Sequence, residues 1–214
     1  MPTPRIPRPL TAQAPGTGRF TAGVRREDAG GVDDAPPRGR APVDCRTLAM
    51  MKPMTADQIV ASIINAEPAE IERMELPGLH EVVWDDREFL GWRDPQGSLR
   101  GYLVHWVDDR PVGIVLRAAS SSLRPGIGAM CSLCHTPQPA TQVLMFSARR
   151  GGRSGRDGNS IGTYICADLA CSIMIRIFPG MSEMRLMRDE LIARRSAGLT
   201  QRVEAFTARI LETV

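Results

Sequence analysis

The chain has 214 residues, of which 43% are hydrophobic and 5% aromatic, so it is long enough to bury the core of one main domain. No apolar run approaches the eighteen residues of a transmembrane helix, and the N-terminus lacks the apolar segment of a secretory signal. The net charge is +3, and residues 1–50, with eight arginines against five acidic residues, account for it. The remainder is neutral, which argues against a strongly electrostatic nucleic-acid-binding domain. We therefore expect a cytoplasmic protein without a membrane partner.

Residues 1–50 are rich in Pro, Gly, Ala and Arg and have no helical or strand periodicity, which predicts a disordered tail. Met50, Met51 and Met54 stand directly before the first predicted helix. Each of them is an alternative start, so a segment that is never translated is the second interpretation of this tail. Cys45 is predicted to be a free surface thiol.

Order is predicted to begin with a short helical segment in residues 51–78. Thr55 and Gln58 have the spacing of a capping box, and apolar residues then recur at helical intervals. Pro68 interrupts this pattern, and a second short helix is predicted over residues 69–75.

Residues 79–120 are predicted to form an antiparallel β-meander. Short runs of β-branched and aromatic residues alternate there with the turn sequences Asp-Pro-Gln-Gly and Asp-Asp-Arg-Pro. The predicted strands cover residues 82–84, 89–93, 101–107 and 111–117. Packing against the sheet, rather than base stacking, is predicted for Trp84, Trp92 and Trp106, because no basic residues are expected to interleave with them on the same face. Structural roles are predicted for His80 and His105.

Two closely spaced cysteine pairs are the most specific chemical signal in the chain. Cys131 and Cys134 have the two-residue gap of a zinc knuckle, and Cys166 and Cys171 follow after a segment long enough for a β-hairpin. Four thiolates fill a tetrahedral shell, so one structural Zn²⁺ is predicted. A disulfide, a redox CxxC motif and a different metal are weaker alternatives, because an oxidising compartment is not expected and His-Thr-Pro-Gln-Pro follows the knuckle. His135 is predicted to lie beside the metal site without binding the metal.

The segment between the cysteine pairs predicts a hairpin. Residues 143–146 and 161–165 form its strands, and residues 149–160 form a mobile tip rich in Gly, Arg and Ser. Guanidinium groups on such a tip can bind carboxylates or phosphates through paired hydrogen bonds. The candidate contact residues, weighed equally against a merely solvated loop, are Arg149, Arg150, Arg153 and Arg156.

A helix is predicted to begin at Cys166, with Asp168 in its first turn and Cys171 in its second. The order of knuckle, hairpin and helix is that of a treble clef, which we assign to residues 128–180. The gap of four residues in the second pair is wider than usual. If Cys171 fails to reach back to the site, only three protein ligands remain.

Residues 181–214 are predicted to form two closing helices over residues 182–196 and 200–213. Gly198 marks the break, and Thr200 is the predicted N-cap of the last helix. The apolar stripe of that helix is predicted to consist of Val203, Phe206 and Ile210. The predicted fold class is therefore α+β, with a short helical segment, a β-meander and a treble-clef zinc finger followed by two helices.

The second cysteine pair lies in a longer run, GRDGNSIGTYICADLACS, and upstream of it stand LGWRDP, RGYLV, VGIVLRA and CSLC. Together these motifs resemble the elongation factor G-binding protein family, the FusB-type proteins with a C-terminal treble-clef zinc finger, over about residues 52–214. The resemblance implies an FBP-like domain over residues 51–214 and a partner, elongation factor G, that is bound by the zinc domain. It also implies the zinc ligands Cys131, Cys134, Cys166 and Cys171. Tyr164 is a candidate for the contact surface, although packing beside the zinc site is the preferred interpretation. The N-terminal part is shorter than in the best-described members, so drug resistance is not implied.

Three functions are compared. The leading hypothesis is a non-enzymatic zinc protein that binds elongation factor G and promotes its release from stalled ribosomes. The alternative is a zinc module whose tip arginines bind ribosomal RNA. An enzyme has the least support, because the chain lacks a Ser/His/Asp order, a phosphate-binding glycine loop and an open metal site. No small-molecule substrate is expected.

Overall fold

The computed structural model describes residues 51–97, 99–121, 123–177 and 185–212. The described residues all belong to one compact unit. The tail predicted for residues 1–50, with Cys45, lies outside the described residues.

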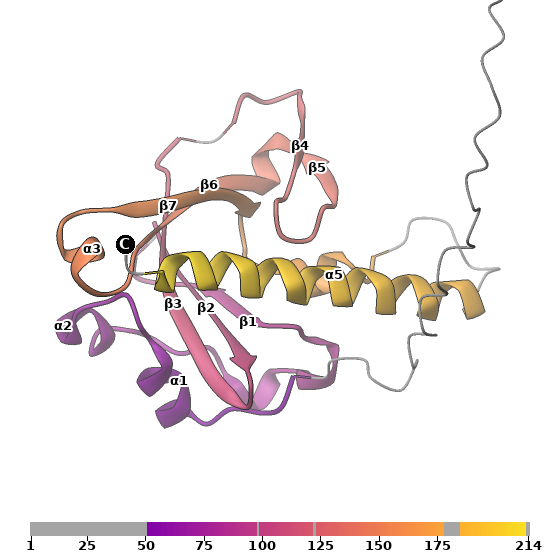
Figure 1. The fold of residues 1–214 in the computed structure, drawn as a ribbon. Helices are drawn as coiled ribbons and strands as arrows, with labels where there is room; N and C mark the ends of the chain where they lie inside the picture. Colours follow the sequence, from indigo (N-terminus) through magenta and orange to yellow (C-terminus); the bar gives the residue numbers. More distant parts are fainter. Residues whose placement is uncertain (1–50, 98, 122, 178–184, 213–214) are drawn as a thin grey trace, which may run out of the picture. The chain divides into compact units, whose positions relative to one another are not determined.

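Five of the described strands form one antiparallel sheet in the order β1-β2-β3-β6-β7 (Figure 1). Their bounds are Leu90–Arg93 (β1), Arg100–Val107 (β2), Arg110–Ala118 (β3), Val143–Arg149 (β6) and Ser160–Cys166 (β7). Asp108 and Asp109 both have a positive φ, which gives the tight turn between β2 and β3 the twist that a two-residue hairpin requires. The predicted meander is therefore confirmed for three of its four strands.

The strand predicted over residues 82–84 is wrong. This region contains two short 3₁₀ turns, η1 (Leu79–Glu81) and η2 (Trp84–Asp86). His80 in η1 is exposed and lies 3.6 Å from a carboxylate oxygen of Glu81. Trp92 is buried and stacks on Tyr102 with 4.9 Å between ring centroids, and the other two tryptophans pack against the same core cluster, as predicted.

The sheet is narrow at its centre. β6 and β7 pair along seven residues, but β3 and β6 pair only through Arg117 with Ser147 and Ala118 with Phe146. Beyond these two pairs, the meander and the β6–β7 hairpin diverge, as Figure 1 shows. The hairpin tip, predicted to be a mobile loop, contains a helical turn, α3 (Gly152–Arg156).

The N-terminal helices are α1 (Ala56–Ser62) and α2 (Pro68–Ile71). The predicted capping box is confirmed, because Thr55 Oγ1 accepts a hydrogen bond from Gln58 N and Gln58 Oε1 accepts one from Thr55 N. Ile59 of α1 is fully buried in a core cluster that also contains residues of β1 and β2. The second helix begins at Pro68 and is shorter than predicted.

A single helix, α5 (Arg185–Leu211), closes the fold, so the prediction of two helices broken at Gly198 is wrong. Thr200 lies inside α5 and is not an N-cap. The predicted apolar stripe is nevertheless buried, and it joins β6 and β7 in a second core cluster. Among the described helices, α5 included, none combines the length and the apolar character that crossing a bilayer requires.

A buried polar contact ties the two C-terminal helices to the start of the sheet. Glu88, just before β1, accepts hydrogen bonds from Arg176 Nη2 at 2.9 Å and from Ser196 Oγ of α5 at 2.7 Å. Ser172 of α4 (Cys171–Met174) accepts a hydrogen bond from the Glu88 backbone N–H through its Oγ. Pairing the Glu88 carboxylate with a cation and a hydroxyl offsets the cost of burying its charge.

Candidate metal centre

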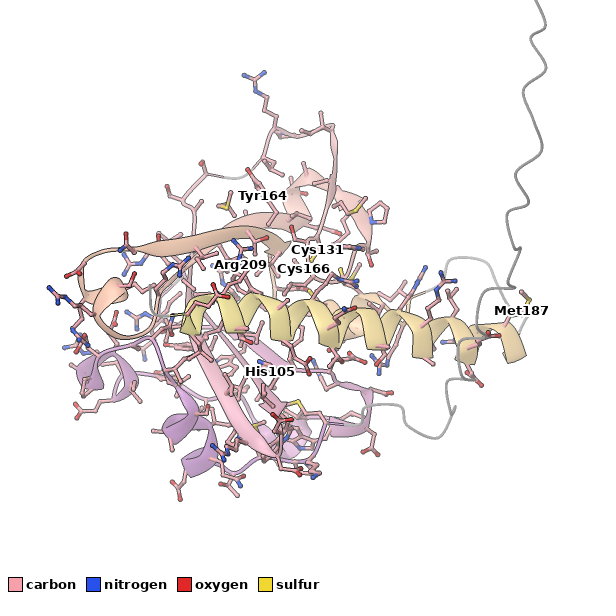
Figure 2. The ribbon with its side chains drawn as sticks, viewed as in Figure 1. His105, Cys131, Tyr164, Cys166, Met187 and Arg209 are labelled. Atoms are coloured by element: carbon pink, nitrogen blue, oxygen red, sulfur yellow. The ribbon has the colours of Figure 1, made fainter. Side chains whose placement is uncertain are left out.

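Four buried cysteines from three places in the fold come together. Cys131 and Cys134 follow β4 (Gly128–Met130), which pairs with β5 (Pro137–Pro139), whereas Cys166 ends β7 and Cys171 opens α4. Their sulfur atoms all lie within 4.8 Å of one another, and two of the pairs, Cys131 with Cys171 and Cys134 with Cys166, are 3.6 Å apart. Figure 2 labels Cys131 and Cys166 next to each other, beside α5.

These distances fit a tetrahedral zinc ion. A Zn–S bond of about 2.3 Å places the sulfur ligands of one ion about 3.8 Å apart, close to the separations observed here. The cluster could therefore hold one zinc ion, bound by thiolates alone.

The predicted helix start at Cys166 is wrong. Residues 167–170 form a loop, in which Leu169 adopts a left-handed backbone conformation with φ of 61°. Asp168 stabilises this loop, because its Oδ1 accepts a hydrogen bond from Ala170 N at 3.0 Å. The four-residue gap is thus spanned by a tight turn, and Cys171 reaches the cluster from the first position of α4.

Hydrogen-bond donors surround the sulfur atoms. Cys131 Sγ accepts from the backbone N–H groups of Leu133 and Cys134, each at 3.4 Å. The buried Gln138 donates from Nε2 to Cys166 Sγ at 3.2 Å. Donors aimed at thiolates favour their charged form and orient them. Sequence reasoning missed Gln138, because a glutamine between two prolines carries no signal of its own.

The crowding of the thiols affects their ionisation. Hydrogen bonding with Cys131 lowers the pKa of Cys134, whereas hydrogen bonding with Cys131 and Cys134 raises the pKa of Cys166 and raises that of Cys171 well above its usual value. Two of the thiols therefore ionise readily, and the other two resist ionisation because each further thiolate faces a negative charge already present. A divalent cation removes this obstacle, so its binding is coupled to the release of protons.

The loop between the second pair of cysteines is docked onto the sheet. A Cβ atom added to Gly91 of β1 would lie 2.6 Å from the carbonyl oxygen of Leu169, so only glycine lets the loop approach this closely. Ala167 accepts a hydrogen bond from Arg93 Nη1 through its carbonyl at 3.3 Å. On the knuckle side, Arg202 of α5 donates from Nε to the carbonyl of Leu133. The cluster is thereby connected to both the meander and the closing helix.

His135 lies beside the knuckle but is exposed and is not one of the clustered donors, in agreement with its predicted place. Its φ of 55° and the hydrogen bond from its N–H to the carbonyl of Cys131 complete the turn of the knuckle. The residue therefore shapes the backbone of the site.

A family model described as FBP C-terminal treble-clef zinc-finger matches residues 58–210. The chain belongs to this family. The observed hairpin, four-cysteine cluster and following helix are the elements of its treble clef. Among solved structures, that of the fusidic acid resistance protein FusC matches with a TM-score of 0.46 and 15% identity, over 73% of this chain and 58% of that chain. This FBP-family chain thus spans less than two thirds of FusC. Comparison with curated proteins gives no significant match.

Three of the four predicted tip arginines, Arg149, Arg150 and Arg156, line one small cavity, and Arg153 does not. Arg149 lies 3.5 Å from Glu70 of α2, and Arg150 donates from Nη1 to the carbonyl of Glu212 at 3.1 Å. Arg153 lies 3.8 Å from its i+4 neighbour Asp157. Arg156 lines a cavity together with Arg149.

Tyr164 lies on the outer face of β7. Its neighbour Ile165 is fully buried, and because alternate residues of a strand face opposite sides, the Tyr164 side chain faces away from the core. Figure 2 shows it on the side of the hairpin opposite α5. Tyr164 is therefore placed where a partner could reach it.

Proposed function

We propose that this chain is a non-catalytic binding protein that holds one structural zinc ion and binds translation elongation factor G. Membership of the FBP family is the observation that carries the proposal, since the motifs of the chain resemble those of elongation factor G-binding proteins. The proposed zinc ligands are Cys131, Cys134, Cys166 and Cys171. Four thiolates close the metal shell and leave no position for a reacting water molecule, which supports a structural role for the ion.

The zinc end of the molecule offers a surface for such a partner. Three large apolar side chains are exposed there: Ile127 before β4, Met130 in β4 and Tyr164 in β7. The Ser132 N–H donates to the carbonyl of Tyr164 at 2.8 Å, which joins the knuckle to the hairpin. Aromatic residues and methionine are enriched in protein interfaces. We therefore place the contact here and not at the tip, where Arg149, Arg150 and Arg153 already have partners within the chain.

Release of the factor from a stalled ribosome is the second part of the proposal. A binding protein shifts such an equilibrium only if it prefers a conformation of the factor that the ribosome does not hold. A zinc-fixed surface suits this task, because a rigid surface loses little binding energy to its own ordering.

The test measures the affinity of the zinc-loaded chain for purified elongation factor G by calorimetry, with metal content determined on the same samples. Met130→Ala and Tyr164→Ala should each weaken binding about tenfold, the effect of losing one buried contact residue. The matched control is Met187→Ala. Met187 is as exposed as Met130, at 57%, but lies at the far end of α5 (Figure 2).

If all three variants weakened binding equally, the proposed contact surface would be wrong. If the zinc-loaded protein had no affinity for elongation factor G, the proposed partner would be wrong. Repeating the titration at high salt, with ribosomal RNA as well as the factor, distinguishes this proposal from the RNA-binding alternative. Binding to ribosomal RNA that falls steeply with salt, without binding to the factor, would favour the RNA module.

A further inference from the structure

A cavity of about 540 Å³ opens where β3 and β6 diverge, well within the size range of small-ligand sites. Its walls come from α2, the start of β2, β3, β6 and the α3 turn. The charged residues that line it are Arg100, Arg117, Arg149, Arg156, Glu67 and Glu70.

Asn65, between α1 and α2, holds the two strands apart at the edge of this cavity. Its side-chain amide accepts a hydrogen bond from Val115 N at 2.7 Å and donates to the carbonyls of Val115 of β3 and Arg149 of β6 at 3.0 and 3.1 Å. The amide thus occupies the place of a missing strand and satisfies backbone groups that the divergence leaves open. The cavity is therefore a built feature of the sheet.

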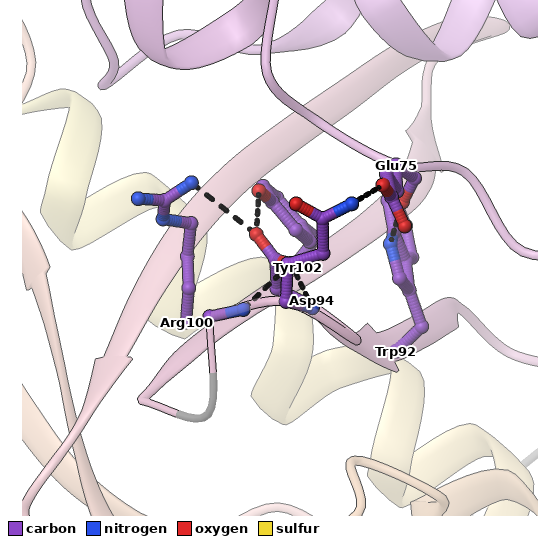
Figure 3. Close-up of polar contacts among 7 residues, drawn as sticks. Glu75, Trp92, Asp94, Arg100 and Tyr102 are labelled. Atoms are coloured by element: carbon purple, nitrogen blue, oxygen red, sulfur yellow. Dashed lines mark hydrogen bonds and ion pairs between the residues drawn. The ribbon is translucent and has the colours of Figure 1, made fainter.

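Two of the lining arginines already have carboxylate partners. Arg149 lies 3.5 Å from Glu70, and Arg100 lies 3.2 Å from the buried Asp94. Asp94 also accepts hydrogen bonds from the Tyr102 hydroxyl at 3.1 Å and from the backbone N–H groups of Gln96 and Gly97, which fix it in place (Figure 3). Arg100 is thereby held at the cavity wall by a rigid partner.

Arg117 and Arg156 have no ion-pair or hydrogen-bond partner for their guanidinium groups among the described residues. Arg117 belongs to β3, and Arg156 ends the α3 turn on another wall. The turn can fold back only because residue 155 is glycine, since a Cβ there would lie 1.7 Å from the carbonyl oxygen of Arg150. Two guanidinium groups from separate elements, both without a partner among the described residues, therefore line one cavity.

We propose that this cavity binds the phosphate group of a small phosphorylated compound. The lining residues carry four positive and two negative charges, and the buried Asp94 beside Arg100 adds a third negative charge. The site keeps a net positive charge, which favours a phosphate group, whose charge is about −2. Planar guanidinium groups bind phosphate oxygens through paired hydrogen bonds. No aromatic residue is among the lining residues, so the site lacks a platform for stacking a base and recognises the phosphate itself. This inference is independent of the proposed binding of elongation factor G.

The test titrates the zinc-loaded full chain with pyrophosphate in a calorimeter. Arg117→Gln and Arg156→Gln should each weaken binding at least about tenfold, because each removes a charge-assisted contact. The matched control is Arg153→Gln. Arg153 stands on the same helical turn, but its side chain is 89% exposed and does not line the cavity. The control should bind pyrophosphate like the unchanged protein, and all variants should retain their zinc.

Two further probes test whether the cavity recognises phosphate in particular or any anion. Succinate, a dicarboxylate, should bind much more weakly than pyrophosphate, and a short single-stranded RNA should not bind in competition with it. Absence of saturable pyrophosphate binding, or equal weakening by Arg153→Gln, would overturn the proposal. Succinate binding as strong as pyrophosphate binding would show a general anion site and overturn the assignment to phosphate. RNA binding that pyrophosphate fails to displace would also overturn that assignment.

Discussion

His105 shows how a single residue acquires its character from burial. It lies in β2, is 2% exposed, and its Nε2 is 2.9 Å from Thr207 Oγ1 of α5. The Thr207 hydroxyl donates to the carbonyl of Val203, so it accepts a hydrogen bond from the imidazole. Burial lowers the pKa of His105 from 6.5 to about 4. The structural role predicted for it agrees with this environment.

This shift predicts a pH dependence of stability. Between pH 6.5 and about 4 the unfolded chain binds a proton at His105 that the folded chain does not, so stability falls as the pH drops through this window. Between pH 7 and pH 5 the loss should be about 2 kcal/mol. His105→Gln, which does not titrate, should lack this part of the loss. Urea unfolding of both proteins at the two pH values measures the difference, and identical losses would contradict the assignment.

At the scale of elements, the loop of residues 167–170 and β1 depend on each other. The carbonyl oxygen of Leu169 lies 2.6 Å from the position of a Cβ added to Gly91. This oxygen belongs to the backbone, so it cannot turn aside as a side chain would. The loop carries Cys166 and Cys171 at its two ends. Its position on the sheet therefore sets the distance between two sulfur atoms.

We expect Gly91→Ala to destabilise the fold by about 1–3 kcal/mol, the usual cost of overpacking, and to weaken zinc binding as the loop shifts. Competition with a coloured chelator measures the zinc affinity, and thermal unfolding measures the stability. Gly128→Ala is the control, because a Cβ at Gly128 meets no atom within 4 Å. Unchanged zinc affinity in the Gly91→Ala variant would contradict the dependence of the metal site on the position of this loop.

The helix α5 illustrates an element decided by packing. Glycine inside a helix costs about 1 kcal/mol relative to alanine, and Gly198 followed by Thr200 therefore indicated a break. In the structure the neighbouring Leu199 and Val203 are almost fully buried against the sheet, and this burial outweighs the cost. Thr200 Oγ1 is left buried without a partner, so the hydroxyl that suggested a cap makes no hydrogen bond.

At the scale of the whole molecule, the cysteines are part of the main hydrophobic core. They share one buried cluster with residues of β3, β6, β7, α4 and α5. Removing the proposed zinc ion would leave four crowded thiols inside this cluster, with no ion to join the segments that carry them. The metal and the core therefore stabilise the same set of elements.

Chelation of zinc, or Cys171→Ser, should abolish cooperative unfolding, because structural zinc contributes folding free energy on the order of 10 kcal/mol. Near-ultraviolet circular dichroism and calorimetry with and without chelator measure the loss. Cys45→Ser, which changes the cysteine outside the cluster, is the matched control and should unfold like the unchanged protein. Full stability of the zinc-free chain would contradict a structural metal.

Local features were predictable from the sequence. The capping box at Thr55, the β2–β3 hairpin and the zinc knuckle each depend on residues within a few positions of one another, whose geometry follows from their own backbone and side chains. Residues 82–84 were misread as a strand because Val82 and Trp84 pack against the core without strand pairing.

The sequence by itself determined the family, the candidate zinc ligands and the order of meander, hairpin and helix, because residue spacing and periodicity are properties of neighbouring positions in the chain. Only the tertiary structure decided that α5 is continuous, that Cys171 opens a helix and that Asn65 stands between two diverging strands. It alone brought Arg117 and Arg156 to one cavity. These features join residues separated by tens of positions, and their energies come from burial and from hydrogen bonds that exist only after the sheet has formed.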